Sequence, residues 1–288
     1  MEERVFEGTP IFHFMRNSGD KTMKRYETIL WDVDGTILNF LKSEEFALKK
    51  AFSDYQLTIT EETVSLYSGI NESYWKRLER GEITKEAVLY GRFEELFRRL
   101  LEMAETKKEM LTDWFCKRDR ENDFEIVVKR KIKQVPVKEF QQAYQIYLGS
   151  IYFYQDDSLE LCKKLQKDFK QYIVTNGVEW TQRNKLQLAG FTELMEDIFI
   201  SEVIGAPKPD KSFFEACFRQ IPDFNKENTI IIGDSLSSDM LGGNRAGIAT
   251  CWYNPKKLAK TSDVQIDYEI RNLWEVETVL WQNHQIKN

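Results

Sequence analysis

The 288-residue chain has little of what several classes of protein depend on. No apolar run approaches the roughly 20 residues that a membrane-spanning helix requires. The first 22 residues lack the continuous apolar core of a signal peptide. We therefore expect a cytoplasmic protein that acts without a membrane partner.

Histidine and cysteine are also scarce. The two histidines, His13 and His284, lie near the ends of the chain, where segments are often poorly ordered. A Ser-His-Asp triad or an HExxH zinc site needs a histidine within the site. The four cysteines include no CxxC pair, which favours reduced thiols over a zinc site or a disulfide framework. Any catalysis must then use carboxylates, lysines, hydroxyls or a metal ion.

An excess of positive charge is absent as well. The formal net charge is −6, which argues against a nucleic-acid polymer as partner. With 42% apolar and 31% charged residues, the chain has the composition of an ordinary globular protein and is long enough for a large core. We expect a monomer or a homodimer.

The patterning divides the chain into an extension, a core and a helical insertion. Residues 1–22 show no clear period and are interpreted as an N-terminal extension. A helical pattern runs from 39 to 149. Residues 23–38 and 150–288 are predicted to form one α/β core that this insertion interrupts.

Within the insertion, Thr60 and Thr84 are predicted to begin helices, and Gly81 separates the two. The stretch 103–133 is dense in charge, with basic and acidic residues interleaved. This mixture favours a solvated helix face or an irregular insertion over a nucleic-acid patch.

The core alternates strands with helices. Apolar and β-branched runs predict strands at 27–33, 171–175, 198–201, 229–233 and 248–253. Helical patterns lie between them, at 158–168, 179–189, 210–219 and 237–246. Continuous apolar strands of this kind are typical of a Rossmann-like parallel sheet with helices on both faces.

Polar residues follow several of these strands. Asp32 and Asp34 come at the end of the first strand, residues 175–177 (Thr-Asn-Gly) end the second, and Asp234 follows the run TIIIG. In open α/β sheets the ligand site lies outside the carboxyl ends of the strands, so these groups should converge there, together with Lys208.

The charges of such a cluster require compensation. Asp32, Asp34, Asp234 and Asp239 would bring four negative charges together, against one positive charge on Lys208. A hard divalent cation with oxygen ligands, namely Mg²⁺, suits this site. The metal, the lysine and the backbone amides near Asn176 would together neutralise a phosphoryl group.

The spacing of the first two aspartates also has a chemical meaning. A carboxylate can attack phosphorus and form an aspartyl-phosphate. A second carboxylate two residues later can protonate the leaving oxygen and then activate water. Gly35 gives the backbone the freedom to turn directly after this pair.

Four motifs in this order resemble those of the haloacid dehalogenase (HAD) superfamily. They are DVDGT at 32–36, VTNG at 174–177, KPD at 208–210 and GDSLSSD at 233–239. The resemblance implies that Asp32 is the nucleophile and Asp34 the general acid and base.

The same resemblance implies the ligands of the metal and of the phosphoryl group. Thr175 and Lys208 would bind the phosphoryl group. Asp32, the backbone carbonyl of Asp34 and Asp234 would hold Mg²⁺. Asp239 would bind the metal through water or orient the lysine. Asp210, in contrast, is predicted to be a helix N-cap.

Two further features place the chain within the superfamily. An aspartate at position 34 is typical of phosphatases and phosphomutases, whereas dehalogenases of this fold lack it. The insertion at 39–149 lies where the family carries its helical cap. The segments at 74–97, 201–214 and 233–255 resemble the pyrimidine 5′-nucleotidase branch, which acts on nucleoside monophosphates.

Aromatic and basic residues of the cap are candidates for contact with the substrate. Tyr67, Trp75 and Arg92 could stack on a base or bind a sugar. At helical spacing such residues belong more often to a core, so both interpretations stay open here.

The sequence therefore predicts a Mg²⁺-dependent phosphatase for small phosphomonoesters, in particular nucleoside 5′-monophosphates. A sugar phosphatase or a phosphomutase similar to β-phosphoglucomutase is the first alternative. A binding protein that keeps the fold without turnover is an alternative of another class.

Overall fold

The apolar runs that predict strands come together at the centre of one α/β core. The structure is a computed structural model, and it describes residues 23–57, 59–106, 132–260 and 263–282. The predicted extension, most of the charged stretch 103–133 and both histidines lie outside these residues.

Six parallel strands form the main sheet, in the spatial order β4–β3–β2–β5–β6–β7. They are β2 (Thr28–Trp31), β3 (Lys170–Thr175), β4 (Asp197–Ile200), β5 (Thr229–Gly233), β6 (Ala249–Tyr253) and β7 (Tyr268–Ile270). The first five confirm the predicted strands, whereas β7 was not predicted. Nor was the antiparallel pair of β1 (Met23–Lys24) and β8 (Trp281–Gln282). Because β2 lies between β3 and β5, the residues that follow it lie at the carboxyl ends of the strands, in the middle of the sheet.

The strands are apolar on both sides because helices cover both faces of the sheet. Ile29 and Trp31 pack on one face, and Leu30 packs on the other. The first face is covered by α6 (Ser158–Leu165), α7 (Glu179–Leu188) and α11 (Val276–Leu280). The second is covered by α9 (Lys211–Phe218) and α10 (Leu241–Ala246).

Short elements complete the core. They are α8 (Ser201–Ile204), the 3₁₀ turns η2 (Thr192–Leu194), η3 (Lys226–Asn228) and η5 (Leu273–Glu275), and the π-helical turn η4 (Leu236–Met240). The predicted helix at 237–246 is therefore η4 followed by α10. Asp210 is confirmed as a helix N-cap, since its side chain accepts a hydrogen bond from the Ser212 amide.

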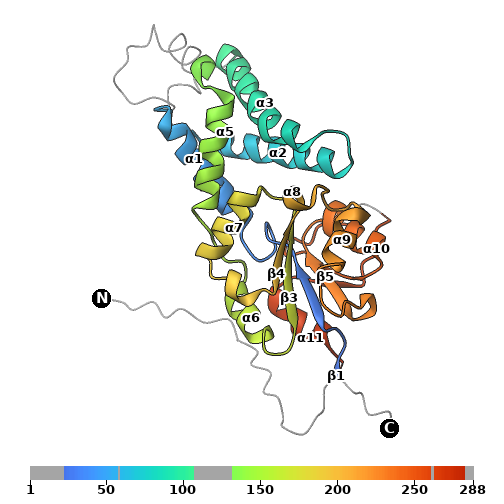
Figure 1. Ribbon diagram of the computed structural model, residues 1–288. Coiled ribbons are helices and arrows are strands. Elements are labelled where there is room, and N and C mark those ends of the chain that lie inside the picture. Colours follow the sequence, from blue (N-terminus) through green and yellow to red (C-terminus); the bar gives the residue numbers. More distant parts are fainter. Residues whose placement is uncertain (1–22, 58, 107–131, 261–262, 283–288) are drawn as a thin grey trace, which may run out of the picture.

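Among the described residues, four of the helices between β2 and β3 form the cap, as the resemblance implies. They are α1 (Phe40–Asp54), α2 (Glu61–Glu79), α3 (Lys85–Thr106) and α5 (Val137–Gly149). They enclose an apolar core of their own, rich in aromatic rings. Thr60 and Thr84 cap α2 and α3 as predicted. Figure 1 shows the cap beyond the edge of the sheet at which α8 lies.

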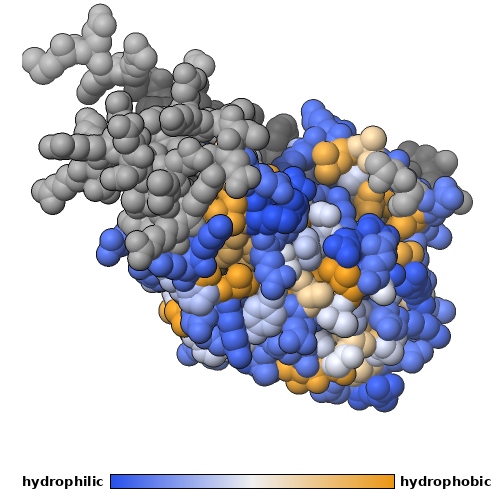
Figure 2. Space-filling model, turned by 90° about the horizontal axis from the view of Figure 1, so that it is seen from above, coloured by the Kyte–Doolittle hydropathy of each residue, from blue (hydrophilic) through white to orange (hydrophobic). Residues whose placement is uncertain are grey.

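The described part of the face shown in Figure 2 is largely polar. Figure 2 shows mostly hydrophilic side chains on the face seen from above, with apolar ones scattered among them. In the described part of the chain, no helix is both long enough and apolar enough to cross a membrane.

The exact boundaries of core and cap, at 38/39 and 149/150, stay predictions.

Candidate active site

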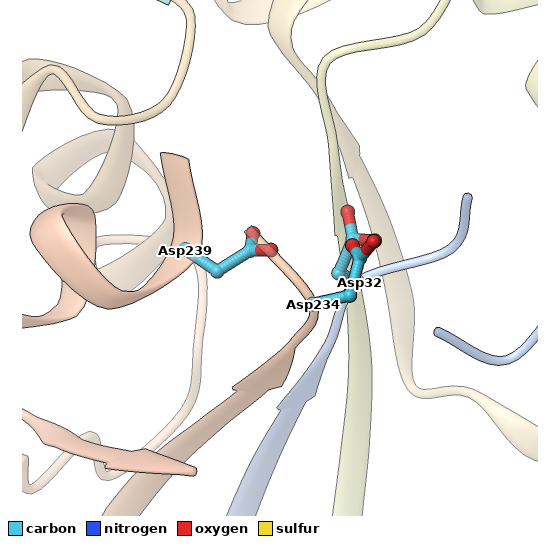
Figure 3. A group of neighbouring side chains, drawn as sticks. All are labelled: Asp32, Asp234 and Asp239. Atoms are coloured by element: carbon cyan, nitrogen blue, oxygen red, sulfur yellow. The ribbon is translucent and has the colours of Figure 1, made fainter. Parts of the chain in front are cut away.

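Three carboxylates meet at the carboxyl ends of the central strands. Asp32 follows β2, Asp234 follows β5, and Asp239 lies in η4. Figure 3 shows Asp32 and Asp234 next to each other, with the carboxylate of Asp239 directed toward them. One oxygen from each residue lies within 4.8 Å of the other two. The structure thus brings together three of the four aspartates that the sequence predicts to converge.

Lys208 is the cation at the centre of this cluster. Its side chain is buried, and Nζ lies 2.7 Å from Asp32 Oδ1 and 2.7 Å from Asp239 Oδ1. The same ammonium donates a hydrogen bond to the Val174 carbonyl oxygen at 2.8 Å. Asp239 is therefore in contact with the lysine, while its role as an orienting residue or as a metal ligand stays a prediction.

The DVDGT turn holds the Asp32 carboxylate from the other side. Thr36 Oγ1 donates a hydrogen bond to Asp32 Oδ2 at 3.2 Å. Gly35 has φ +96°, and a Cβ atom there would lie 2.4 Å from Asp234 Oδ2. Glycine is thus required for two reasons, the left-handed backbone and the close approach of Asp234.

Thr175 and Asn176 end β3 beside this cluster. The Thr175 side chain is buried and accepts a hydrogen bond from the Gly177 amide at 3.2 Å. The Asn176 side chain bonds to both backbone polar groups of Lys208, at 2.8 and 2.9 Å. Asn176 therefore ties the strand end to the loop that carries the lysine. Contact of either residue with phosphate stays a prediction.

Asp34 has partners that the sequence analysis did not identify. Lys185 Nζ forms an ion pair with Asp34 Oδ1, and Gln182 Nε2 donates to Asp34 Oδ2 at 2.6 Å. Both residues lie on α7. Their spacing beside Leu186 is helical, but two polar side chains at such positions cannot be told from a solvated helix face by sequence alone.

The crowding of charge changes the acidity of the cluster. Burial raises the pKa of Asp32 to about 7, with the charge of Asp239 adding to the shift and Lys208 opposing it. Burial alone would lower the pKa of Lys208, but Asp239 and Asp32 outweigh it and raise that pKa. Solvent reaches the Asp234 side chain, yet protein atoms surround it closely. The loss of water around its carboxylate and the charge of Asp32 raise the pKa of Asp234 well above its ordinary value.

These residues fit a divalent cation. The four aspartates carry four negative charges when ionised, and Lys185 and Lys208 supply two positive ones, so two negative charges remain. The donor set consists of carboxylate oxygens, which suit Mg²⁺. A cation at this position would reverse the electrostatic cause of the raised carboxyl pKa values.

The cap also reaches the site through the turn between α2 and α3. Ser237 Oγ donates a hydrogen bond to Glu79 Oε2, near the end of α2. Lys85 Nζ, at the start of α3, donates to the carbonyl oxygens of Asn176 and Gly177 at 3.0 and 2.6 Å. Burial raises the pKa of Glu79 to about 7 and lowers that of Lys85 to about 8.

The three cap residues proposed for substrate contact lie in different surroundings. Tyr67 is buried in the cap core and stacks on Phe93. Arg92 is 1% exposed and donates to Asn71 Oδ1 at 2.6 Å. Trp75 is partly exposed on α2. Tyr67 and Arg92 thus belong to the core of the cap, whereas Trp75 is accessible.

Comparison with known proteins agrees with this geometry. Residues 26–247 match the haloacid dehalogenase-like hydrolases. The chain is 35% identical over 258 residues to the HAD-hydrolase YfnB of Bacillus subtilis, covering 90% of this chain and 97% of YfnB. It is 30% identical over 263 residues to the pyrimidine 5′-nucleotidase PynA of Streptococcus pneumoniae, covering 90% and 96%. The crystal structure of YfnB bound to magnesium has a TM-score of 0.73 and 34% identity, covering 89% of this chain and 99% of YfnB.

Proposed function

Because this chain belongs to the haloacid dehalogenase-like hydrolases, we propose that it is a Mg²⁺-dependent phosphatase that acts on small phosphomonoesters through an aspartyl-phosphate. One observation carries the proposal. Two aspartates at the end of the central strand have separate partners, Lys208 for Asp32 and Lys185 for Asp34. This separation suits two different tasks.

Asp32 is the proposed nucleophile. Its carboxylate is held on one oxygen by Lys208 and on the other by Thr36, so its orientation is determined before substrate arrives. In the first step an Asp32 oxygen forms a bond to phosphorus while the bond from phosphorus to the leaving oxygen breaks. The positive charge of Lys208 stays beside the reacting group and offsets its negative charge.

Asp34 is the proposed general acid and base. Its side chain is 26% exposed, so that a substrate oxygen or a water molecule can reach it. The proton of its carboxyl goes to the leaving oxygen in the first step. In the second step the Asp34 carboxylate takes a proton from water, whose oxygen bonds to phosphorus and releases Asp32 and inorganic phosphate.

The residues that would hold the metal are Asp32, Asp234 and Asp239, with the backbone carbonyl of Asp34. When bound there, Mg²⁺ supplies positive charge that binds and polarises phosphoryl oxygens. The support for this assignment is the residual charge of the cluster, together with the magnesium present in the YfnB crystal structure.

We propose nucleoside 5′-monophosphates as the substrate class. One support is the similarity to PynA, which extends through the cap. The other is that the residues flanking the turn between α2 and α3 contact both Ser237 in η4 and the loop after β3. Closure of these contacts over a bound substrate would exclude water from the phosphoryl group. Of the three cap residues, the accessible Trp75 stays a candidate for contact with the nucleoside.

A phosphate-release screen tests the proposal. Purified protein with Mg²⁺ is offered nucleoside 5′-monophosphates and sugar phosphates, and released phosphate is measured. We expect release from the nucleotides, pyrimidine ones foremost, and none after chelation of the metal. Conversion of a sugar phosphate without phosphate release would indicate a phosphomutase instead. Absence of turnover across the panel would overturn the proposal in favour of a binding protein.

A further inference from the structure

Gln182 and Lys185 on α7 enclose the Asp34 carboxylate. Lys185 pairs with Oδ1 and Gln182 donates to Oδ2 at 2.6 Å. They are three residues apart, a spacing that puts both side chains on one face of a helix. Each of the two carboxylate oxygens thus has its own donor, and both donors come from one rigid element.

Both side chains are buried to a degree that is unusual for their type. Lys185 and Gln182 are each 1% exposed. Lysine is almost never fully buried unless it is paired, and in the described part of the chain its only ion pair is with Asp34. A buried ion pair is weak evidence for a role in stability, because the loss of hydration offsets the attraction of the charges.

The loop after β3 fixes Gln182 from the opposite side. A Cβ atom at Gly177 would lie 1.9 Å from Gln182 Nε2, so the side chain is wedged between this loop and Asp34. The helix itself is anchored to the end of the cap, since Asn184 Nδ2 donates to the Gly149 carbonyl oxygen at 2.8 Å. The amide of Gln182 therefore has little freedom to turn away from the carboxylate.

We propose that Gln182 and Lys185 are positioning residues for the proton-transfer steps. This inference rests on the proposed function, in which Asp34 gives its proton to the leaving oxygen and later takes one from water. The two side chains keep the carboxylate facing the phosphoryl group in both steps. They form no bonds to the substrate themselves, because Asp32 attacks phosphorus and Asp34 transfers the protons.

The expected signature is a dependence on the leaving group. An alkyl phosphomonoester has a basic leaving oxygen that needs a proton, whereas 4-nitrophenyl phosphate has a much less basic one. We expect Lys185→Met to lower kcat/KM for an alkyl phosphomonoester by about 100-fold, the low end of what general acid–base catalysis contributes. For 4-nitrophenyl phosphate the same variant should lose only a few-fold.

Further variants keep the test decisive if Lys185→Met folds poorly. Gln182→Leu introduces no unpaired charge and should show the same signature, with a loss of about 10-fold on the alkyl ester for one lost hydrogen bond to a carboxylate. Lys185→Arg keeps the cation and should restore most of the activity. The matched control is Arg183→Met on the same helix, since Arg183 is exposed and pairs with Glu179; it should behave like wild type.

A double variant separates positioning from general damage. In an Asp34→Asn background, Lys185→Met should cause little additional loss, because its effect acts through Asp34. An equal loss on both esters, or full additivity in the double variant, would overturn the inference while leaving the phosphatase intact. If the wild-type protein hydrolyses neither ester, the proposed function fails and this inference fails with it.

Discussion

The core and the cap each bury positive charge, but they pair it in different ways. In the core, Lys208 and Lys185 contact aspartates directly. In the cap, Arg92 and Glu44 are buried without an ion pair between them. Asn71 lies between the two, accepting from Arg92 Nη1 at 2.6 Å and donating to Glu44 Oε1 at 2.7 Å.

This difference matches what each region does. The core carboxylates must stay close to a cation because phosphoryl chemistry concentrates negative charge there. The cap network leaves Arg92 Nε and Nη2 without a hydrogen-bond partner in the described structure. Burial raises the pKa of Glu44, and Arg92 opposes that shift. Direct pairing thus occurs at the proposed active site, and indirect pairing occurs in the packed interior of the cap.

The largest expected effect tests the core half of the comparison. Asp32→Asn removes the nucleophile but keeps the shape of the side chain, and we expect kcat to fall by at least about 10⁴-fold. Phosphate release with Mg²⁺ measures it. Asp210→Asn is the matched control, because asparagine caps a helix equally well and Asp210 lies outside the cluster. Substantial Mg²⁺-dependent activity in Asp32→Asn would contradict the mechanism.

The next effect tests the cap half. Arg92→Met leaves Glu44 buried without its compensating charge, so we expect the free energy of unfolding to fall by about 3 kcal/mol. Denaturant unfolding measures this loss. Arg98→Met, on the exposed face of the same helix, should change it by less than about 0.5 kcal/mol. A stable Arg92→Met would show that indirect pairing contributes nothing to the cap.

A titration at the boundary of core and cap should produce an intermediate effect. Burial raises the pKa of Glu79 to about 7 from its ordinary 4.5. The folded state therefore keeps its proton longer than the unfolded state, and wild type loses stability as pH rises from 4.5 to 7. Glu79→Gln cannot ionise at this position. Its free energy of unfolding should therefore rise relative to that of wild type between pH 4.5 and 7, by at most about 3 kcal/mol.

Thermal unfolding of both proteins with a metal chelator, from pH 4 to pH 8, measures this gain. The two curves should coincide near pH 4 and separate above it. Glu82→Gln is the control in the same turn, because Glu82 is exposed and its pKa is lowered beside Arg80. A constant difference between Glu79→Gln and wild type at every pH would count against a buried Glu79.

The same comparison explains which residues the sequence could predict. Asp32 and Asp234 each follow a buried strand and Thr175 is the last residue of one, and parallel strands bring their carboxyl ends to one edge. Their convergence therefore follows from patterning alone, and the four motifs add their roles. The strands themselves were predictable because continuous apolar runs are typical of a sheet covered on both faces.

Other parts depend on contacts that patterning does not contain. Gln182 and Lys185 lie on a helix whose inward face is partly polar, so they resemble a solvated face until Asp34 is placed against them. Glu79 meets Ser237 only because a cap turn folds back onto the core. The strand β7 has three residues, of which Ile270 alone is buried, which is too short a pattern to separate from a loop.

The smallest expected effect compares two glycines of similar backbone conformation, one in each region. Gly35 in the core and Gly81 in the cap turn have φ +96° and +72°, so alanine strains the backbone at both. Only at Gly35 would the new Cβ meet a neighbour, at 2.4 Å from Asp234 Oδ2, whereas nothing lies within 4 Å at Gly81. We expect Gly35→Ala to weaken Mg²⁺ binding about tenfold by displacing that carboxylate.

Calorimetric titration of each variant with Mg²⁺ separates the two contributions. Gly81→Ala should bind the metal like wild type and lose only about 1 kcal/mol of stability, since its strain is confined to the backbone. If both variants weaken Mg²⁺ binding equally, backbone strain is the cause and the approach of Asp234 to Gly35 is irrelevant. If neither does, Asp234 is not a metal ligand. Weaker Mg²⁺ binding in Gly35→Ala alone would show that the metal site requires a residue without a side chain at position 35 as well as its carboxylates.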